Sequence, residues 1–594
     1  MYYQDIYKLI LAEEANYKLP VSVAENYDWS MYDQIRTTVL YKNSTYKSGK
    51  DDNKPFKNII RPILNLQYRA EGFDVKDITL YIEESKQYFK SFLIKKYHER
   101  WASENEIDTF IDELVESYVD FGGALIKDIN DNKPEVVPLQ RIAFCDQTDI
   151  LSGPIAEKHS YSPDQLKEQE KKGWKNIDQL IELSRTERST SEPQSPQKAK
   201  TPGKYIEIYE VHGVFPASWV EDGEGDGESE DKEEYTRQLH ICAFYYNKEN
   251  KKTGISLFKG KERDLVYKLI LRDKIYGRAL GLGGAEELFD PQVWTNYSEI
   301  RKKQMLDQAS KVIYQTADPA FANRNKTGNL DNGEILITKE GMPLSQINTY
   351  PASLALFEKS VNDWFAHARL MGAATESILG EQPSSGTPFK LQELVTAESH
   401  SLHEYRKGKI ATFLEGVYRE WIIPHLVREI SSGDTFLSEL DTDELTQIAD
   451  QLVESEVNRT VKEKILSGET VYPEEVALLK QEVRDAFMKG GNKKFLEILE
   501  GEMKDLPIGL KINIVGKQKD LAGMVDKLVN VWRSIVANPA ILQAPQMAKL
   551  FNQIIEYSGL SPIDFYGFTA PVAPVAPVAP VAPTQQVEPV PLPA

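Results

Sequence analysis

The chain has 594 residues, of which 41% are hydrophobic and 10% aromatic. This length exceeds what one hydrophobic core usually holds, so two or three domains are expected, and the aromatic content excludes general disorder. The formal net charge of -20 disfavours a protein that grips nucleic acid over its whole surface. An acidic wall that repels a DNA backbone remains compatible with it, although most of the charge is expected to serve solubility.

Only two cysteines occur, Cys145 and Cys242, and their spacing fits no metal motif. The sequence therefore predicts no disulfide framework, which fits a reducing cytoplasm. Residues 1–8 lack a basic region followed by an apolar one, so no signal peptide is expected. No apolar run approaches the roughly 18 residues of a membrane span, so no membrane partner is expected.

Helices and short strands alternate in the first half of the chain. Apolar residues at three- and four-residue steps predict helices over 2–14, 29–40, 83–102 and 104–121. Gly122-Gly123 is expected to end the last of these. Period-two alternation predicts strands over 124–128, 135–139, 142–144, 204–215 and 240–247, with further candidates at 254–258 and 264–271. Together these elements predict an α+β fold.

Two insertions interrupt the predicted strands. Residues 185–204 are rich in Ser, Thr, Pro, Gln and Lys, which predicts disorder. Residues 221–234 are acidic and place side chains at the spacing of a calcium loop: Asp222, Glu224, Asp226, Gly227, Glu230 and Glu233. The flanks, however, indicate strands rather than helices, and Ser229 stands where an apolar anchor is needed. A solvated acidic loop is the preferred interpretation, with calcium binding left open.

Three long helices are predicted in the centre, over 290–316, 351–380 and 391–430, and Asp290-Pro291 is the expected N-terminus of the first. One apolar face of the first helix comprises Val293, Tyr297, Ile300, Leu306, Ala309 and Ile313. One side of the second comprises Leu354, Phe357, Val361, Trp364, Phe365, Ala368 and Met371. The first connector, 317–350, contains a predicted strand at 334–338, and the second, 381–390, is a Pro/Ser/Gly loop.

The last part of the chain returns to mixed elements. Pro424 is expected to end or kink the third long helix. Helices are predicted over 442–468, 474–495, 520–536 and 547–558, with a strand at 510–515. From residue 569 onward proline recurs every third position, the period of a polyproline II helix, which predicts a stiff, solvated tail that acts as a spacer or, alternatively, as a partner ligand.

No residue pattern indicates catalysis, so we expect no enzyme, no cofactor and no metal. Gly281–Gly284 lacks the lysine of a phosphate loop and the third glycine of a dinucleotide fingerprint. His400 and His403 share a helix face, but a metal would need a third ligand, and a polar helix face is the simpler interpretation. His240 and Cys242 lie on one side of a predicted strand and are expected to pack there, while His367 is expected at an interface or in the core.

The central order is helix, small lobe, helix, flexible loop and long helix. The segment Gly-Arg-Ala-Leu-Gly-Leu-Gly at 277–283 precedes the first helix, and Asp-Pro-Gln-Val-Trp-Thr-Asn at 290–296 begins it. In this order and pattern the chain resembles the portal proteins of tailed bacteriophages, over most of its length but without a catalytic signature. Residues 56–72 resemble the early portal segment in which an N-terminal helix crosses the wing. The resemblance implies these divisions: an N-terminal wing (1–285), a first stem helix (286–316), a clip (317–350), a second stem helix (351–380), a tunnel loop (381–390), a long wing helix (391–430), a C-terminal wing and crown (431–568) and a disordered tail (569–594).

The same resemblance implies a ring of identical subunits, a dodecamer, at one vertex of a virion capsid and assembled in the host cytoplasm. Double-stranded DNA would pass through its channel without sequence specificity during packaging and ejection. The implied protein partners are the terminase, the head–tail adaptor and the major capsid or scaffold protein. Two alternatives remain open: a neck or capsid structural protein without a DNA channel, and a metal-dependent hydrolase.

Two groups of residues are candidates for contact with DNA. The tunnel-loop group consists of Gln382, Pro383, Ser384, Ser385, Gly386, Thr387 and Lys390. Its hydroxyls and single amine suit phosphate contacts, although an ordinary helix connection explains the same composition. The stem group consists of Arg301, Lys302, Lys303 and Lys311, which would face DNA, a neighbouring subunit or solvent.

Overall fold

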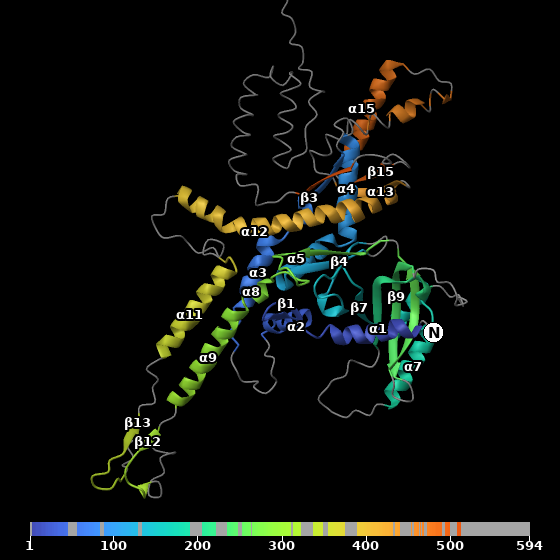
Figure 1. Ribbon diagram of the computed structural model, residues 1–594. Helices are drawn as coiled ribbons and strands as arrows, with labels where there is room; N and C mark the ends of the chain where they lie inside the picture. The colour runs from blue at the N-terminus through green and yellow to red at the C-terminus, as the bar shows by residue number, and fades with distance from the viewer. Residues whose placement is uncertain are drawn as a thin grey trace, which may run out of the picture. The chain divides into compact units, whose positions relative to one another are not determined.

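The computed structural model describes residues 3–44, 56–82, 88–128, 133–190, 205–220, 234–246, 252–262, 264–310, 313–321, 337–347, 354–374, 389–431, 434–439, 457–462, 472–489, 493–498 and 508–512, with isolated positions between 453 and 467 (Figure 1). The chain divides into two compact units, Met1–Gly516 and Lys517–Ala594, and every described residue belongs to the first. The predictions for 221–233, 520–536, 547–558 and 569–594 lie outside the described residues. No described helix is long and apolar enough to cross a membrane.

A five-stranded antiparallel sheet is built from the first half of the chain. Its order is β10 (Lys252–Lys261), β9 (Tyr235–Tyr246), β8 (Ile206–Pro216), β7 (Ile155–Tyr161) and β6 (Ile142–Phe144). The alternating pattern predicts all of these except β7. Helices α6 (Pro163–Glu170) and α7 (Ile177–Thr190) pack on the sheet through apolar residues such as Leu166 and Ile181. Because α7 continues to Thr190, the predicted disorder is wrong for residues 185–190, and residues 191–204 lie outside the described part.

A three-stranded sheet and three helices form the neighbouring core. The sheet order is β11 (Tyr267–Leu271), β4 (Gly123–Lys127) and β5 (Glu135–Val137). The helices are α3 (Ile60–Glu71), α4 (Tyr88–Glu104) and α5 (Ile107–Phe121). Helix α5 buries Phe110, Leu114 and Tyr118 at helical spacing, and Gly122 ends it in the left-handed conformation, at φ 76°. The mixture of helices and sheets confirms the predicted α+β class.

The remaining short elements join distant parts of the chain. Helices α1 (Tyr3–Asn16) and α2 (Met31–Lys42) flank the hairpin of β1 (Val21–Ala24) and β2 (Tyr27–Trp29). Strand β3 (Ile78–Ile82) pairs antiparallel with β16 (Ile508–Ile512), and β14 (Asp434–Glu439) pairs with β15 (Lys493–Ile498). Helix α15 (Pro473–Lys489) is shorter than the predicted 474–495, because residues 493–495 belong to β15.

The three predicted central helices are present, with different ends. They are α9 (Phe289–Ala309), α11 (Leu354–Met371) and α12 (Phe389–Val417), and α8 (Gly284–Glu287) precedes the first. Helices α9 and α11 pack along each other (Figure 1). Residues Ile313–Gln315 form strand β12, which pairs with β13 (Ser345–Ile347), so the prediction of helix to residue 316 is wrong. Helix α11 ends at Met371 and not at the predicted residue 380. Ala373, two residues after this end, adopts the left-handed conformation.

Other predicted boundaries also need correction. Asp290 does not cap α9, because the helix begins at Phe289 and its N-cap position, Leu288, has no side-chain cap. Ile337 and Thr338 lie in no strand, and residues 334–336 are outside the described part. Pro424 does not end the third helix: a π-helical turn, Tyr418–Ile422, leads into α13 (Ile423–Ser431). A π turn already departs from the regular hydrogen-bond ladder, so it can accommodate a proline that lacks an amide proton.

The buried side of α9 is polar, which the apolar pattern does not predict. Its buried residues are Pro291, Gln292, Thr295, Asn296 and Ser298, whereas Tyr297 and Leu306 are exposed. Gln292 accepts from the amide of Ile59 at 2.8 Å and donates to the carbonyl of Lys57 at 2.8 Å. These contacts satisfy backbone groups beside α3, so hydrogen bonds hold the first half of α9 to the body. Trp294 and Tyr297 remain exposed.

A close backbone approach leads into these helices. A Cβ atom added at Gly281 would lie 2.7 Å from the carbonyl oxygens of both Asp273 and Gly122. No real Cβ tolerates that distance from backbone oxygen, so the segment before α8 must shift if residue 281 carries a side chain.

We therefore expect Gly281→Ala to lower the free energy of unfolding by about 1–3 kcal/mol. Gly408→Ala is the matched control: Gly408 lies in α12, and a Cβ there has no neighbour within 4 Å. That control should raise stability by about 0.5–1 kcal/mol, because alanine favours the helix. Chemical denaturation measures both, and equal effects of the two substitutions would contradict the close approach.

Candidate functional site

Helices α9 and α11 form a pair joined by stacked rings and an ion pair. The Trp294 and Trp364 rings are 6.2 Å apart and 10° from parallel. Nζ of Lys302 lies 2.9 Å from Oε1 of Glu358, and this hydrogen bond raises the pKa of Lys302. Because the ion pair is largely exposed, most of the stability of the helix pair comes from its packed side chains.

Large apolar side chains also cover the outside of this pair. On α11, Val361 and Ala368 are buried, as the predicted apolar side requires, but Leu356 and Leu370 are 68% and 77% exposed. The two leucines are fourteen positions apart, so they lie close to the same line along the helix. Lys359, Ser360, Asp363 and His367 lie between them on this side of α11. The described part of the chain therefore leaves two large leucine side chains of α11 exposed among polar residues.

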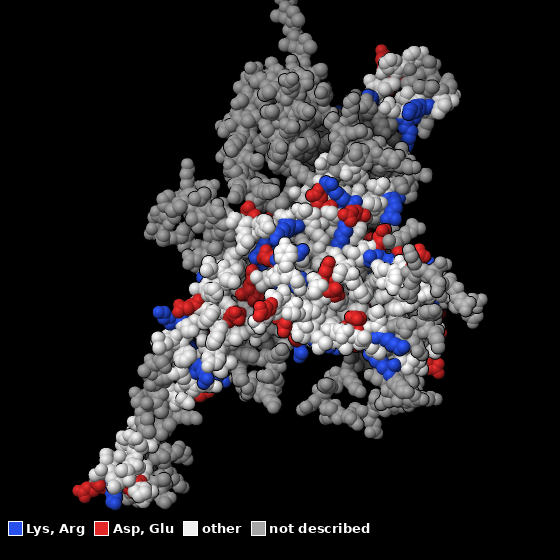
Figure 2. Space-filling view, in the orientation of Figure 1, with Lys and Arg blue, Asp and Glu red and all other residues white. Residues whose placement is uncertain are grey.

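The predicted basic group on α9 is distributed around the helix. Arg301, Lys302 and Lys303 are consecutive and so span roughly 200° of its circumference. Arg301 lies over the ring of Tyr297, 5.3 Å from its centre, and Lys302 is engaged by α11. Lys311 lies outside the described residues. Figure 2 shows acidic and basic side chains interspersed over the visible described surface.

The tunnel-loop candidates lie almost entirely outside the described residues. Positions 375–388 are not described, and Lys390 belongs to the first turn of α12. The structure does describe where the loop leaves the fold, because α11 ends in a turn at Gly372–Ala374. Ala374 donates its amide to the carbonyl of Arg369 at 2.8 Å, and Ala374 itself is buried.

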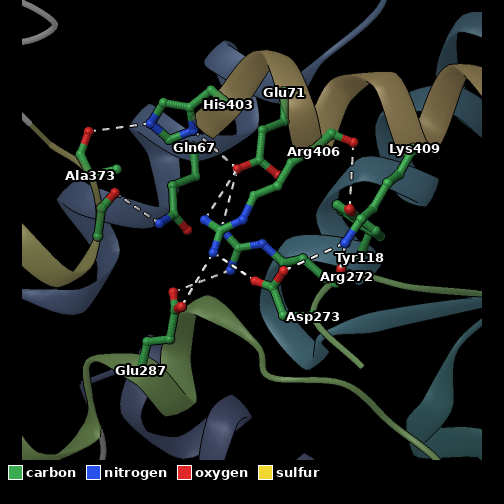
Figure 3. Close-up of polar contacts among 11 residues, drawn as sticks. Gln67, Glu71, Tyr118, Arg272, Asp273, Glu287, Ala373, His403, Arg406 and Lys409 are labelled. Atoms are coloured by element: carbon green, nitrogen blue, oxygen red, sulfur yellow. Dashed lines mark hydrogen bonds and ion pairs between the residues drawn. The ribbon is translucent and has the colours of Figure 1, made fainter. Parts of the chain in front are cut away.

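A buried cluster of charged side chains holds that turn in place (Figure 3). Gln67 and Glu71 come from α3, Arg272 and Asp273 from the end of β11 and the residues after it, Glu287 from α8, and His403, Arg406 and Lys409 from α12. Gln67 donates to the carbonyl of Gly372 at 3.0 Å. Nε2 of His403 lies 3.3 Å from the carbonyl oxygen of Ala373. The start of the loop is therefore bound to both α3 and α12.

A single carboxylate oxygen occupies the centre of the cluster. Oε1 of Glu71 lies 3.2 Å from Nη2 of Arg272, 3.1 Å from Nδ1 of His403 and 3.8 Å from Nη1 of Arg406. Glu71 and Arg272 are completely buried.

The outer contacts balance the charges of the cluster. Nη2 of Arg406 lies 2.7 Å from Oδ2 of Asp273 and 3.3 Å from Oε1 of Glu287. Burial raises the pKa of Glu287, and the guanidinium groups of the two arginines offset only part of that rise. Burial lowers the pKa of Arg406, but the surrounding carboxylates, Glu287 first among them, outweigh it and leave the pKa raised.

Three carboxylates, Glu71, Asp273 and Glu287, thus face three cationic side chains, Arg272, Arg406 and Lys409. A buried charge is tolerated only with such partners. With its central members closed to solvent, the cluster can position α3, α12 and the loop start, but it presents little to a substrate.

The structure corrects the interpretation of His403, which is a buried member of this cluster rather than part of a polar helix face. His400 lies in α12, and its side chain is outside the described part. The packing prediction for β9 is confirmed: His240 and Cys242 are both buried, and His240 Nε2 lies 2.8 Å from Gln238 Oε1. Cys145 and Cys242 are free thiols. His367 is exposed, which excludes a core position within this chain.

Sequence reasoning missed Glu71, Arg272, Glu287 and Arg406, although a signal was present. Gln67 and Glu71 continue the helical spacing of the buried residues Ile60, Ile63 and Leu64 on α3. Polar residues in phase with an apolar helix face are expected to be buried and paired. The identity of their partners, however, depends on the tertiary fold.

No family model and no curated protein matches the chain. Among solved structures, a chain from the neck of an empty gene transfer agent particle, computed with C6 symmetry, is 10% identical, with 69% of this chain and 80% of that chain covered and a TM-score of 0.29. A chain from the virion of a native gene transfer agent particle is 9% identical, with 93% and 99% covered and a TM-score of 0.33. Likeness at this level establishes no family.

We predict that Glu71→Gln lowers the free energy of unfolding by about 3–5 kcal/mol, because it removes the carboxylate that Arg272 and Arg406 need in a buried place. The control is Glu415→Gln, which breaks an ion pair with Arg419 whose side chains are 44% and 65% exposed. That control should change stability by less than about 0.5 kcal/mol. Denaturant titration of both variants decides, and similar small losses would show that the cluster contributes little.

Proposed function

We propose that the chain is the subunit of a closed ring at one vertex of a phage-like capsid, through which double-stranded DNA enters and leaves. The ring would be a dodecamer that docks the terminase during packaging and the head–tail adaptor afterwards, and would contact the major capsid or scaffold protein. It would be part of the virion and assemble in the host cytoplasm. No catalytic role is proposed for it.

The observation that carries this proposal is the exposure of several large apolar side chains on the α9–α11 pair. α9 uses polar residues to attach to the body and leaves Tyr297 outside, and α11 leaves Leu356 and Leu370 outside. Exposed apolar area of this kind is stabilised by burial against another surface. A second copy of the chain is a suitable cover, since a helix pair has two different sides and a head-to-tail contact between them closes into a ring.

The buried cluster around Glu71 supports the proposed passage of DNA through the ring. It fixes both the turn at the end of α11 and the body of α12, so the loop between them would start and end at defined places in every subunit. Ser384, Ser385 and Thr387 would then form a collar of small hydroxyl groups around the ring axis. Such a collar suits a duplex that must slide, because weak contacts to phosphate carry no sequence information.

The small lobe with β12 and β13 would form the docking end. It is inserted between α9 and α11 in the chain, so both helices lead directly to it. A lobe that projects from the end of a helix pair can contact partners without disturbing the packing between subunits. This is the part we assign to the terminase and to the adaptor.

Assembly should depend on the two exposed leucines of α11, Leu356 and Leu370. We expect Leu356→Glu and Leu370→Glu each to reduce ring formation at least tenfold while the fold of the subunit is kept, because a buried charge would be left without a partner. Analytical ultracentrifugation measures the assembled fraction, and circular dichroism checks the fold.

The matched control is Asn362→Glu, which adds the same charge at an exposed position about 120° around the helix from Leu356 and about 80° from Leu370. It should assemble as the wild type does. Unchanged assembly of both leucine variants would remove the basis of the proposed interface.

Passage of DNA should depend on the loop. Deletion of Ser384–Thr387 is expected to leave rings intact and to lower DNA packaging or retention at least tenfold, because the collar is shortened and the anchoring cluster is untouched. Electron microscopy scores the rings, and nuclease-protected DNA in particles scores packaging. Loss of the rings would instead assign the loop a structural role, and normal packaging would argue against a collar.

A further inference from the structure

A second polar cluster lies where the five-stranded sheet meets β4 and β11. Strands β7 and β8 each contain the pattern Glu-x-His, at Glu157–His159 and at Glu210–His212. In the antiparallel register Glu157 stands directly opposite Glu210. Alternate residues of a strand point to the same face, so all four side chains share one side of the sheet. Two carboxylates directly opposite each other destabilise a sheet unless a cation lies between them.

One cation, Lys127 on β4, contacts only one oxygen of each carboxylate. Its Nζ lies 3.0 Å from Oε1 of Glu157 and 2.8 Å from Oε1 of Glu210. Tyr267 donates a hydrogen bond to the same Glu157 oxygen, and His212 Nε2 lies 3.1 Å from the same Glu210 oxygen. Contacts with Lys127, Tyr267 and His212 therefore engage both Oε1 atoms and fix the orientation of both carboxylates.

The other two oxygens converge on His159. Nε2 of His159 lies 2.9 Å from Oε2 of Glu210 and 3.6 Å from Oε2 of Glu157. This nitrogen is buried, and although Oε2 of Glu210 is close, the angles do not meet those of a hydrogen bond. One imidazole nitrogen and two carboxylate oxygens thus lie together within 4.8 Å of one another.

The charge of the cluster favours a further cation. Lys127 is the amine that contacts both Glu157 and Glu210, and His212 lies between Glu210 and Glu262. The described cluster therefore contains three carboxylates, Glu157, Glu210 and Glu262, around one amine.

The distances suit a transition metal. Tetrahedral zinc, with bonds of about 2.0–2.1 Å, separates its ligand atoms by about 3.3 Å, a value between the two contacts of His159. Imidazole as a ligand favours Zn²⁺ over Mg²⁺ and Ca²⁺. Lys127, Tyr267 and His212 would act as the outer hydrogen-bonding shell that orients metal ligands. The side chains of His159 and Glu210 are each 20% exposed, which leaves a path for an ion.

We propose that Glu157, His159 and Glu210 bind one divalent transition-metal ion, which bridges β7 and β8 at the junction of the two sheets. The inference is independent of the proposed ring function, because none of these residues belongs to the helix pair or to the cluster around Glu71.

The test uses the full chain, stripped of metal with a chelator and titrated with ZnCl₂ in a calorimeter. We expect one strong site per chain, with Mg²⁺ and Ca²⁺ unable to compete at equal concentration. Co²⁺ should give visible absorption bands of an imidazole and carboxylate site, and Zn²⁺ should abolish them. A wild-type protein without a one-site isotherm and without Co²⁺ bands would overturn the proposal without any variant.

Variants locate the site. His159→Gln and Glu210→Gln should each weaken Zn²⁺ binding at least tenfold and remove the Co²⁺ bands, with circular dichroism checking that each variant is folded. The matched control is His425→Gln, at a histidine 3.6 Å from the single carboxylate of Glu429. It should leave the isotherm unchanged. Binding that survives both substitutions at β7 and β8 would place the metal elsewhere and overturn the assignment.

Discussion

The described fold depends on a buried carboxylate, Glu71, whose polar partners come from two other segments of the chain. Glu71 is completely buried. Helix α3 can therefore pack in its observed position only when Arg272, which follows β11, and His403 of α12 contact this carboxylate. These residues are far apart in sequence, and their contacts fix the position of α3 relative to α12. Because removal of one partner of a buried pair leaves an unpaired charge, the cluster allows few alternative arrangements.

That constraint separates a rigid part of the molecule from the parts offered to partners. The cluster fixes the turn after α11 through His403 and Gln67, and polar contacts from Gln292 attach α9 to the same body. Both long helices are therefore held without use of all their apolar side chains. Apolar side chains that remain exposed, such as Leu370, are the ones that a neighbouring copy would cover in the proposed ring. The proposal thus depends on polar contacts that attach the helices to the body and on apolar side chains that stay exposed.

Local patterns in the sequence predict most elements but not their partners. Period-two alternation places β8 and β9, and helical spacing places α5, because each pattern reflects one buried face. The pairing of β3 with β16 is unpredictable from such patterns, since either strand could pair with any other edge. The buried side of α9 is predicted wrongly because Gln292 and Asn296 accept hydrogen bonds from the backbone amides of Ile59 and Lys57, and these bonds outweigh apolar burial. Likewise, the sequence shows that Glu71 lies on the apolar face of α3, but it does not show which residues contact it.

Cryo-electron microscopy of the purified full-length chain tests the central claim most directly. A closed ring, with the α9–α11 pairs of neighbouring subunits in contact and a central hole about as wide as a DNA duplex, is the predicted result. A monomer whose α11 leucines are covered by its own chain would contradict it, and so would an assembly without a continuous hole.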